Sequence, residues 1–171
     1  MGAPVVAVGA GDVLGSPDGG AAIVEWIVER AQAGLCAIAV GVCEEALRLT
    51  AEYTKTREQF DRPIATFQAV GQRAADAYID TEAIRLTAWQ AAWRIAEGLP
   101  ASAEVAIAKY WAAEGGQRVV HAAQHLHGGM GVDRDYPLHR YFLWAKHLEL
   151  TLGGATPNLL KLGAMLAADP V

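Results

Sequence analysis

The sequence has few of the features that mark exported proteins. It contains only two cysteines in 171 residues, Cys36 and Cys43. They lie seven residues apart in one helical pattern, which separates them by about 10 Å along the helix axis, too far for a disulfide. No basic start precedes the apolar residues at the N-terminus, which argues against a secretory signal. Two reduced cysteines fit a cytoplasmic protein.

Charge of one sign does not accumulate anywhere in the chain. Acidic and basic residues are interspersed and the net charge is -5. The sequence therefore has no basic stripe that would predict nucleic-acid binding, and no polybasic segment that would predict docking on a membrane. Hydrophobic residues make up 53% of the chain. Most of them are alanines spaced by charged residues, without the run of about twenty apolar residues that spans a bilayer. We expect a soluble helical protein of one domain.

Apolar residues recur at every third or fourth position in three long segments, which is the spacing of one helix face. The pattern predicts helices over 21–53, 67–95 and 105–126, with the first as the central helix and Ser102 as N-cap of the third. A shorter helix is expected from Pro137 to about Leu150, and a last one over 157–168.

Short connections force neighbouring helices to run in opposite directions. The sequence therefore predicts an all-α, antiparallel four-helix up-and-down bundle with a short capping helix. We expect residues 21–171 to form this helical domain. Residues 1–20 are rich in glycine and have no helical period, so we expect a connector from a region further upstream.

Three segments in order resemble the C-terminal domain of the acyl-CoA dehydrogenase family. They are Tyr53–Ile64 followed by Phe67-Gln68, then His127–Gly131, then Tyr136–Arg140. The resemblance covers about residues 12–166. It implies a four-helix bundle that binds FAD and makes oligomer contacts, in an enzyme that dehydrogenates acyl-CoA thioesters. The family's active site also needs an N-terminal helical domain and a β domain, which 171 residues cannot contain. The isolated chain is expected to be inactive.

The resemblance also implies which residues contact the cofactor. Arg57, Gln59 and Phe60 would reach the adenosine and pyrophosphate of an FAD held mainly by a neighbouring subunit. A guanidinium can donate two hydrogen bonds to phosphate oxygens, and an aromatic ring offers a flat apolar surface. The remaining members of the expected FAD-binding set are Gln68, His125, Gly128 and Gly129. The alternative is that Arg57 and Phe60 only cap and pack a helix-loop junction.

The glycines and histidines near residue 128 need separate interpretation. Gly128 and Gly129 resemble the loop at which the family's backbone approaches the flavin phosphates, which favours residues without a Cβ. His125 stands where the family usually has a glutamine. Three histidines, His121, His125 and His127, do not predict a metal site, because only the first two share a helical face and no further ligand is evident.

The chain lacks the carboxylate that the family uses as catalytic base. The reaction removes a proton α to a thioester carbonyl, so a proton acceptor must lie at the flavin. The resemblance places the usual glutamate at Leu152 or Gly153, and an alternative glutamate of some members at Ala31. None of these residues accepts a proton. The nearest carboxylates, Glu149 and Glu29, are each displaced by two or more positions.

Three hypotheses follow. The leading one is a subunit that supports FAD in trans while a homologous partner supplies the glutamate, an arrangement associated in the family with bulky polycyclic or steroid-derived acyl-CoAs. The second is a self-sufficient acyl-CoA dehydrogenase in which Glu149 or Glu29 is the base. The third is a helical association module that binds no flavin.

Overall fold

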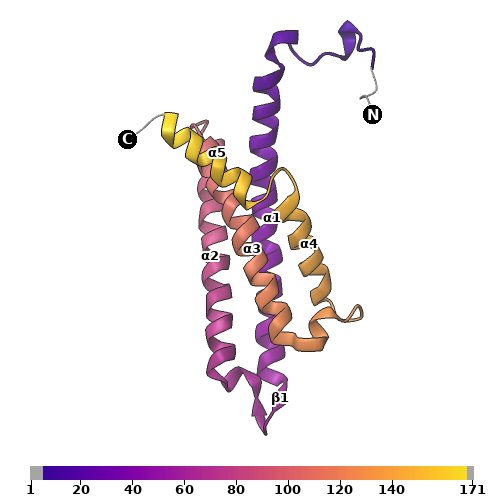
Figure 1. Ribbon diagram of the computed structural model, residues 1–171, viewed down its shortest axis with the longest axis vertical. Coiled ribbons are helices and arrows are strands. Elements are labelled where there is room, and N and C mark those ends of the chain that lie inside the picture. The colour runs from indigo at the N-terminus through magenta and orange to yellow at the C-terminus, as the bar shows by residue number, and fades with distance from the viewer. Residues whose placement is uncertain (1–5, 169–171) are drawn as a thin grey trace.

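The computed structural model describes residues 6–168, apart from the side chain of Pro17. Its five α-helices are α1 (Gly20–Thr56), α2 (Gln68–Ala96), α3 (Ser102–His127), α4 (Leu138–Leu150) and α5 (Ala155–Ala168). Helices α1 to α4 run alternately down and up, and α5 lies across the end of the bundle where α3 begins (Figure 1). This arrangement confirms the predicted all-α up-and-down bundle with a capping helix.

The centre of the bundle is α3, which packs against α1, α2, α4 and α5. The core is built largely from small side chains, and Cys43, Ala46, Ala108 and Val119 are fully buried. The prediction that the first helix is central is wrong. Its uncharged middle is enclosed on one side only, because Ile38 and its small neighbours on the same face are exposed.

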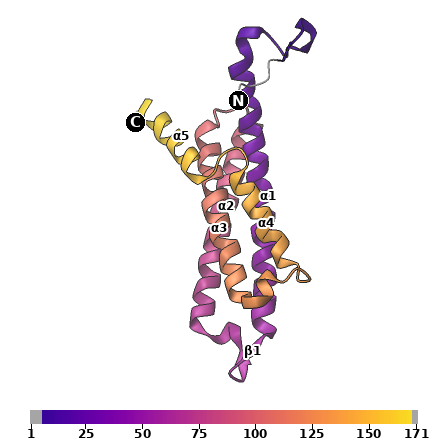
Figure 2. The ribbon, with the colours of Figure 1, turned by 45° about the vertical axis from the view of Figure 1, so that its right-hand side comes forward.

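The N-terminal turns of α1 extend beyond the other helices (Figures 1 and 2). By length and composition α1 could cross a membrane. Its Cys36 and Cys43 are fully buried against the bundle. Both cysteines are free, and burial raises the pKa of each thiol to about 12. Of the predicted connector, residues 1–5 lie outside the described residues, and residues 6–19 contain two 3-10 turns before α1 begins.

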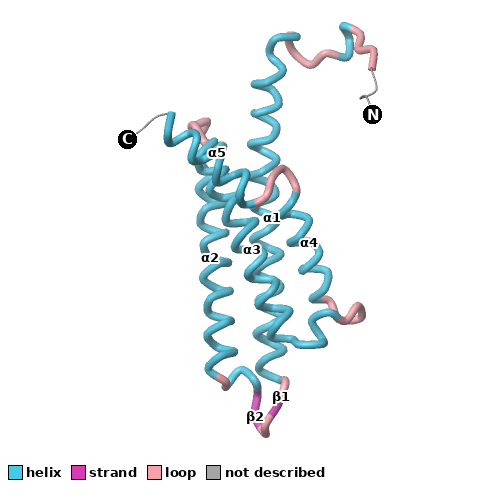
Figure 3. Tube along the Cα trace, in the orientation of Figure 1, coloured by secondary structure: helices cyan, strands magenta, loops and turns pink. Residues whose placement is uncertain are grey.

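A β-hairpin joins α1 to α2 at the opposite end of the bundle (Figure 3). Strands β1 (Glu58–Gln59) and β2 (Arg62–Pro63) pair antiparallel, and a 3-10 turn at Ile64–Thr66 leads into α2. The two residues of the turn, Phe60 and Asp61, have φ angles of 55° and 61°. This left-handed conformation is uncommon for residues other than glycine. Apolar periodicity does not predict the hairpin.

The start of α3 differs from the prediction. Ser102 is the first helical residue and Ala101 occupies the N-cap position. Ser102 does not cap the helix, because its hydroxyl donates a hydrogen bond of 2.6 Å to Oε2 of Glu29 on α1. The serine therefore connects two helices.

Candidate functional site

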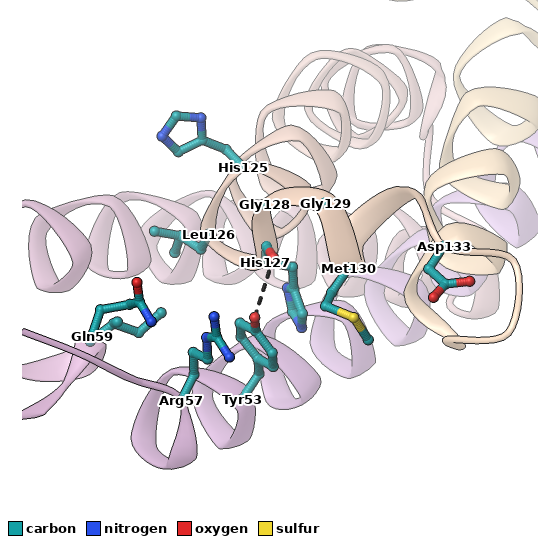
Figure 4. A pocket seen from close by; sticks show the side chains of 11 residues that line it. Tyr53, Arg57, Gln59, His125, Leu126, His127, Gly128, Gly129, Met130 and Asp133 are labelled. Atoms are coloured by element: carbon teal, nitrogen blue, oxygen red, sulfur yellow. Dashed lines mark hydrogen bonds between the residues drawn. The ribbon is translucent and has the colours of Figure 1, made fainter.

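A cavity of about 650 Å³ lies where the hairpin meets the C-terminal ends of α1 and α3 (Figure 4). A short 3-10 helix (Gly128–Val132) after α3 forms its other side. The cavity is lined by Tyr53, Arg57, Gln59, Ile64, His125, Leu126, His127, Gly128, Gly129, Met130 and Asp133. It therefore brings together segments separated by about half the chain.

Arg57 is the residue that ends α1, and its backbone is held on both sides. Its N–H donates to the carbonyl of Tyr53 at 2.8 Å, and its carbonyl accepts from the N–H of Ile64 at 2.8 Å. Within the described residues, its guanidinium makes no hydrogen bond or ion pair. An exposed guanidinium without an internal partner, on a backbone held at both sides, can bind an anion, and its fork matches two phosphate oxygens.

The glycine turn has different requirements at each position. Gly128 has a φ of +60°, which disfavours other residues. At Gly131, an added Cβ would lie 2.6 Å from the carbonyl oxygen of Gln124. At Gly129, an added Cβ would meet nothing within 4 Å. The first and last glycines are therefore needed for the turn itself, whereas Gly129 leaves open space in the wall of the cavity.

His127, the last residue of α3, packs into the base of this turn. Its ring is stacked on Tyr53, with centroids 4.4 Å apart. Nδ1 lies 2.8 Å from the carbonyl oxygen of Ala123, and Nε2 lies 3.2 Å from the hydroxyl of Tyr136. Only 3% of the residue is exposed, and this burial lowers the pKa of His127 below its usual value.

The structure brings five of the seven predicted cofactor-binding residues to the cavity. They are Arg57, Gln59, His125, Gly128 and Gly129. Phe60 and Gln68 do not line it. Phe60 lies at the hairpin turn with 86% of its surface exposed, and its ring lies edge-on to that of Phe67, with centroids 6.1 Å apart. Figure 4 shows the ring of His125 turned away from Arg57 and Tyr53.

Sequence reasoning did not assign a role to six of the lining residues. They are Tyr53, Ile64, Leu126, His127, Met130 and Asp133. Tyr53 and His127 stand within two of the three segments that carry the family resemblance, and that resemblance is the signal that could have identified them. Their contact joins positions 74 residues apart, and the hydroxyl of Tyr53 donates to the carbonyl of His127 at 3.4 Å.

The two positions expected for a catalytic base lie close together. Gln32, next to Ala31 on α1, is 4% exposed, and its Nε2 donates to the carbonyl oxygen of Leu152 at 2.9 Å. The same amide donates to Oδ1 of Asn158 at 3.1 Å. Leu152 and Gly153 both have positive φ angles, 56° and 94°. The residue next to Ala31 thus contacts Leu152, and neither Ala31 nor Leu152 nor Gly153 carries a carboxylate.

The nearest carboxylates are already engaged. Oε2 of Glu149 accepts from Nζ of Lys146 at 2.7 Å. Glu29 accepts from the hydroxyl of Ser102 and from Arg30, the latter at 3.4 Å. In both cases a partner orients the carboxylate within the chain, as expected of residues that stabilise the fold.

Lys109 fixes the start of the loop that follows α4. It is completely buried, and its Nζ donates to the carbonyls of Leu148 at 2.9 Å and Glu149 at 3.1 Å. These carbonyls are among those that α4 leaves without helical partners at its C-terminal end. Burial lowers the pKa of Lys109. The ammonium group therefore ties the centre of the bundle to the loop that contains Leu152.

The bundle, the hairpin and the glycine turn form an all-α domain of the kind that the family resemblance implies. The sequence profile described as "Acyl-CoA dehydrogenase, C-terminal domain" matches residues 18–161. The chain belongs to this family.

Individual proteins show the same relationship. The chain is 52% identical to acyl-CoA dehydrogenase FadE27 of Mycobacterium tuberculosis over 160 residues, 89% of this chain and 43% of that protein. It is 52% identical to a chain in the crystal structure of the ChsE4-ChsE5 complex from the same organism, with a TM-score of 0.89 over 96% of this chain and 44% of that one. It is 50% identical to a chain in the structure titled Tcur3481-Tcur3483 steroid ACAD G363A variant, with a TM-score of 0.81 over 84% and 40% of the two chains. The chain spans less than half the length of these relatives.

Proposed function

We propose that this chain is the C-terminal domain of a subunit that supports FAD without supplying the catalytic base, in a heteromeric acyl-CoA dehydrogenase. The observation that carries the proposal is the contact of Gln32 with Leu152. It places the neighbour of Ala31 beside Leu152, and no carboxylate stands at Ala31, Leu152 or Gly153, the positions at which the family places a base. The cavity beside Arg57 is nevertheless present, as expected of a subunit that contributes to FAD binding but supplies no catalytic base.

The residues of the cavity fit part of an FAD. Arg57 would donate to the phosphate oxygens, Gln59 would contribute a polar group beside it, and the open wall at Gly129 would allow the backbone to approach. Phe60, exposed and held with a positive φ, would contact the cofactor or the adjoining subunit. An FAD held by these residues would supply the hydride acceptor for the dehydrogenation. The contribution of this chain is to bind and orient the FAD.

The partner that we propose is a homologous subunit that carries the glutamate. The similarity to a chain of the ChsE4-ChsE5 complex supports an assembly of unlike subunits. The outer face of α2 also exposes Leu86, Trp89 and Trp93, each more than half exposed, which suits a subunit contact. The similarity to a steroid acyl-CoA dehydrogenase supports a steroid-derived acyl-CoA as substrate. The two free, buried cysteines fit a cytoplasmic location.

The test is to assemble the complete protein with homologues that carry the glutamate. We expect flavin absorbance and acyl-CoA dehydrogenation only when both subunits are present, with steroid-derived acyl-CoA preferred to butyryl-CoA. A homo-oligomer that dehydrogenates acyl-CoA would show that the protein is self-sufficient. Stable assemblies that contain no flavin with any homologue would support an association module instead.

A further inference from the structure

The protonation state of His127 follows from its contacts. The carbonyl of Ala123 can only accept a hydrogen bond, so the nitrogen 2.8 Å from it, Nδ1, carries the proton. In the neutral ring Nε2 then has a lone pair, which accepts from the hydroxyl of Tyr136 at 3.2 Å. A second proton on the ring would force this hydroxyl to turn, and it would place a charge at a residue that is 3% exposed.

The ring of His127 is connected to both sides of the cavity. Its own carbonyl, directly before Gly128, accepts from the hydroxyl of Tyr53 at 3.4 Å (Figure 4). Tyr53 stacks on the ring, and its carbonyl accepts from the N–H of Arg57 at 2.8 Å. The side chain of Tyr53 therefore contacts both the ring of His127 and the carbonyl directly before the glycine turn, and its backbone carbonyl accepts from Arg57. The imidazole thus packs against the residue that links the end of α1 to the start of the glycine turn.

The ionisable groups around His127 come from four segments. Tyr53 on α1 and Tyr136 before α4 contact the ring. Glu52 and Arg48 on α1 lie near Tyr136 and have opposite charges. Arg57, His125 and Asp133 line the cavity beside it. Within the described residues, no carboxylate forms an ion pair with the ring. The surroundings therefore favour a neutral imidazole.

We propose that neutral His127 is a positioning residue that holds the glycine turn and Tyr53 in the arrangement that binds the cofactor, and that its protonation weakens cofactor binding. The proposal rests on the proposed function, because it assigns the cavity to FAD. It goes further by naming a buried residue at the base of the glycine turn whose protonation lowers the affinity for FAD.

The first experiment measures the FAD dissociation constant of the assembled protein between pH 5 and pH 8. In the wild type we expect the affinity for FAD to decrease as the pH is lowered below 6.5, the ordinary pKa of histidine. The decrease should be at most about tenfold per pH unit, because one proton binds to His127 of the protein without FAD. His127→Phe keeps a ring against Tyr53 but cannot titrate, so the dependence should be lost. His147→Gln is the matched control and should keep it, because His147 is exposed on α4 and lies outside the cavity. A His127→Phe protein with the wild-type pH profile would overturn the proposal, as would loss of the profile in His147→Gln.

A second experiment separates this proposal from the assignment of FAD. If Arg57→Ala leaves FAD binding unchanged, the cavity is not the flavin site. The role of His127 in the glycine turn is then tested by NMR of the protein without FAD. NMR of the 171-residue chain should show Nδ1 protonated, and the amide signals of Gly128 and Gly129 moving with the same midpoint as the ring of His127. If the amide signals of Gly128 and Gly129 do not shift as His127 titrates, His127 does not position the glycine turn. If His127→Phe does not fold, His127→Gln replaces it in both experiments.

Discussion

Replacement of Arg57 by alanine should separate cofactor binding from stability. The guanidinium makes no internal hydrogen bond or ion pair among residues 6–168, so its removal leaves no buried group without a partner. We expect the free energy of unfolding to change by no more than about 0.5 kcal/mol. The backbone bonds of Arg57 to Tyr53 and Ile64 are available to any residue except proline, and they remain.

The loss in FAD affinity can be estimated from the same geometry. A bidentate contact with phosphate consists of two charge-assisted hydrogen bonds, each contributing about 1.5–3 kcal/mol. A total near 3 kcal/mol corresponds to a roughly 100-fold higher dissociation constant. Arg57→Lys keeps the charge but not the fork, so it should fall between alanine and the wild type.

The assay is FAD titration of the assembled protein, followed by flavin fluorescence, together with urea unfolding of each variant. Arg73→Ala is the matched control, because Arg73 is also exposed but lies on α2 outside the cavity. An Arg57→Ala protein that binds FAD like the control would refute the assignment. A destabilisation above about 2 kcal/mol would show instead that the arginine stabilises the fold.

Four further substitutions test particular features of the fold and the site. Phe60→Gly relieves the positive φ but loses the contact with Phe67, two effects of about 1 kcal/mol that nearly cancel, so thermal unfolding should change little while FAD affinity falls. Gly131→Ala should destabilise the chain by about 1–3 kcal/mol in urea unfolding because its Cβ would contact the backbone of Gln124, whereas Gly129→Ala should weaken only FAD binding. Lys109→Met should cost about 1–3 kcal/mol near neutral pH. Since burial lowers the pKa of Lys109, the unfolded wild type binds more protons as the pH approaches 10.5, and the difference in unfolding free energy should grow with pH. Unchanged stability in Gly131→Ala, or a difference for Lys109→Met that shrinks with rising pH, would contradict these explanations.

The helices could be predicted from the sequence because their apolar spacing persists for many turns. The position of each helix in the bundle could not. Absence of charge suggested that α1 is central, yet an uncharged helix can also expose small residues and Ile38 on one face. The hairpin was missed because its strands have two residues each and its turn contains Phe60 and Asp61 instead of the glycine or asparagine typical of that conformation.

Part of the lining of the candidate cavity was predictable, where local motifs contain it. Arg57, Gln59 and the glycines follow from the family resemblance, and the structure gathers them in one cavity. Contacts between distant segments were not predictable. The stacking of Tyr53 on His127 joins residues 74 apart, and the hydrogen bond from Gln32 to Leu152 joins residues 120 apart. No local period encodes either contact, because both depend on how the helices pack.

The most direct test of the central claim, that this subunit supplies no base, is the turnover of a Glu29→Gln, Glu149→Gln double variant. Glutamine keeps the shape of each side chain and a carbonyl oxygen that can accept from Ser102 or Lys146. In the complete protein assembled with a glutamate-bearing homologue, the dehydrogenation rate per bound flavin is measured against the wild type. We predict a rate within about twofold of the wild type, because the base lies on the partner. A loss of about 10²–10⁴-fold, the typical contribution of a general base, would contradict the account.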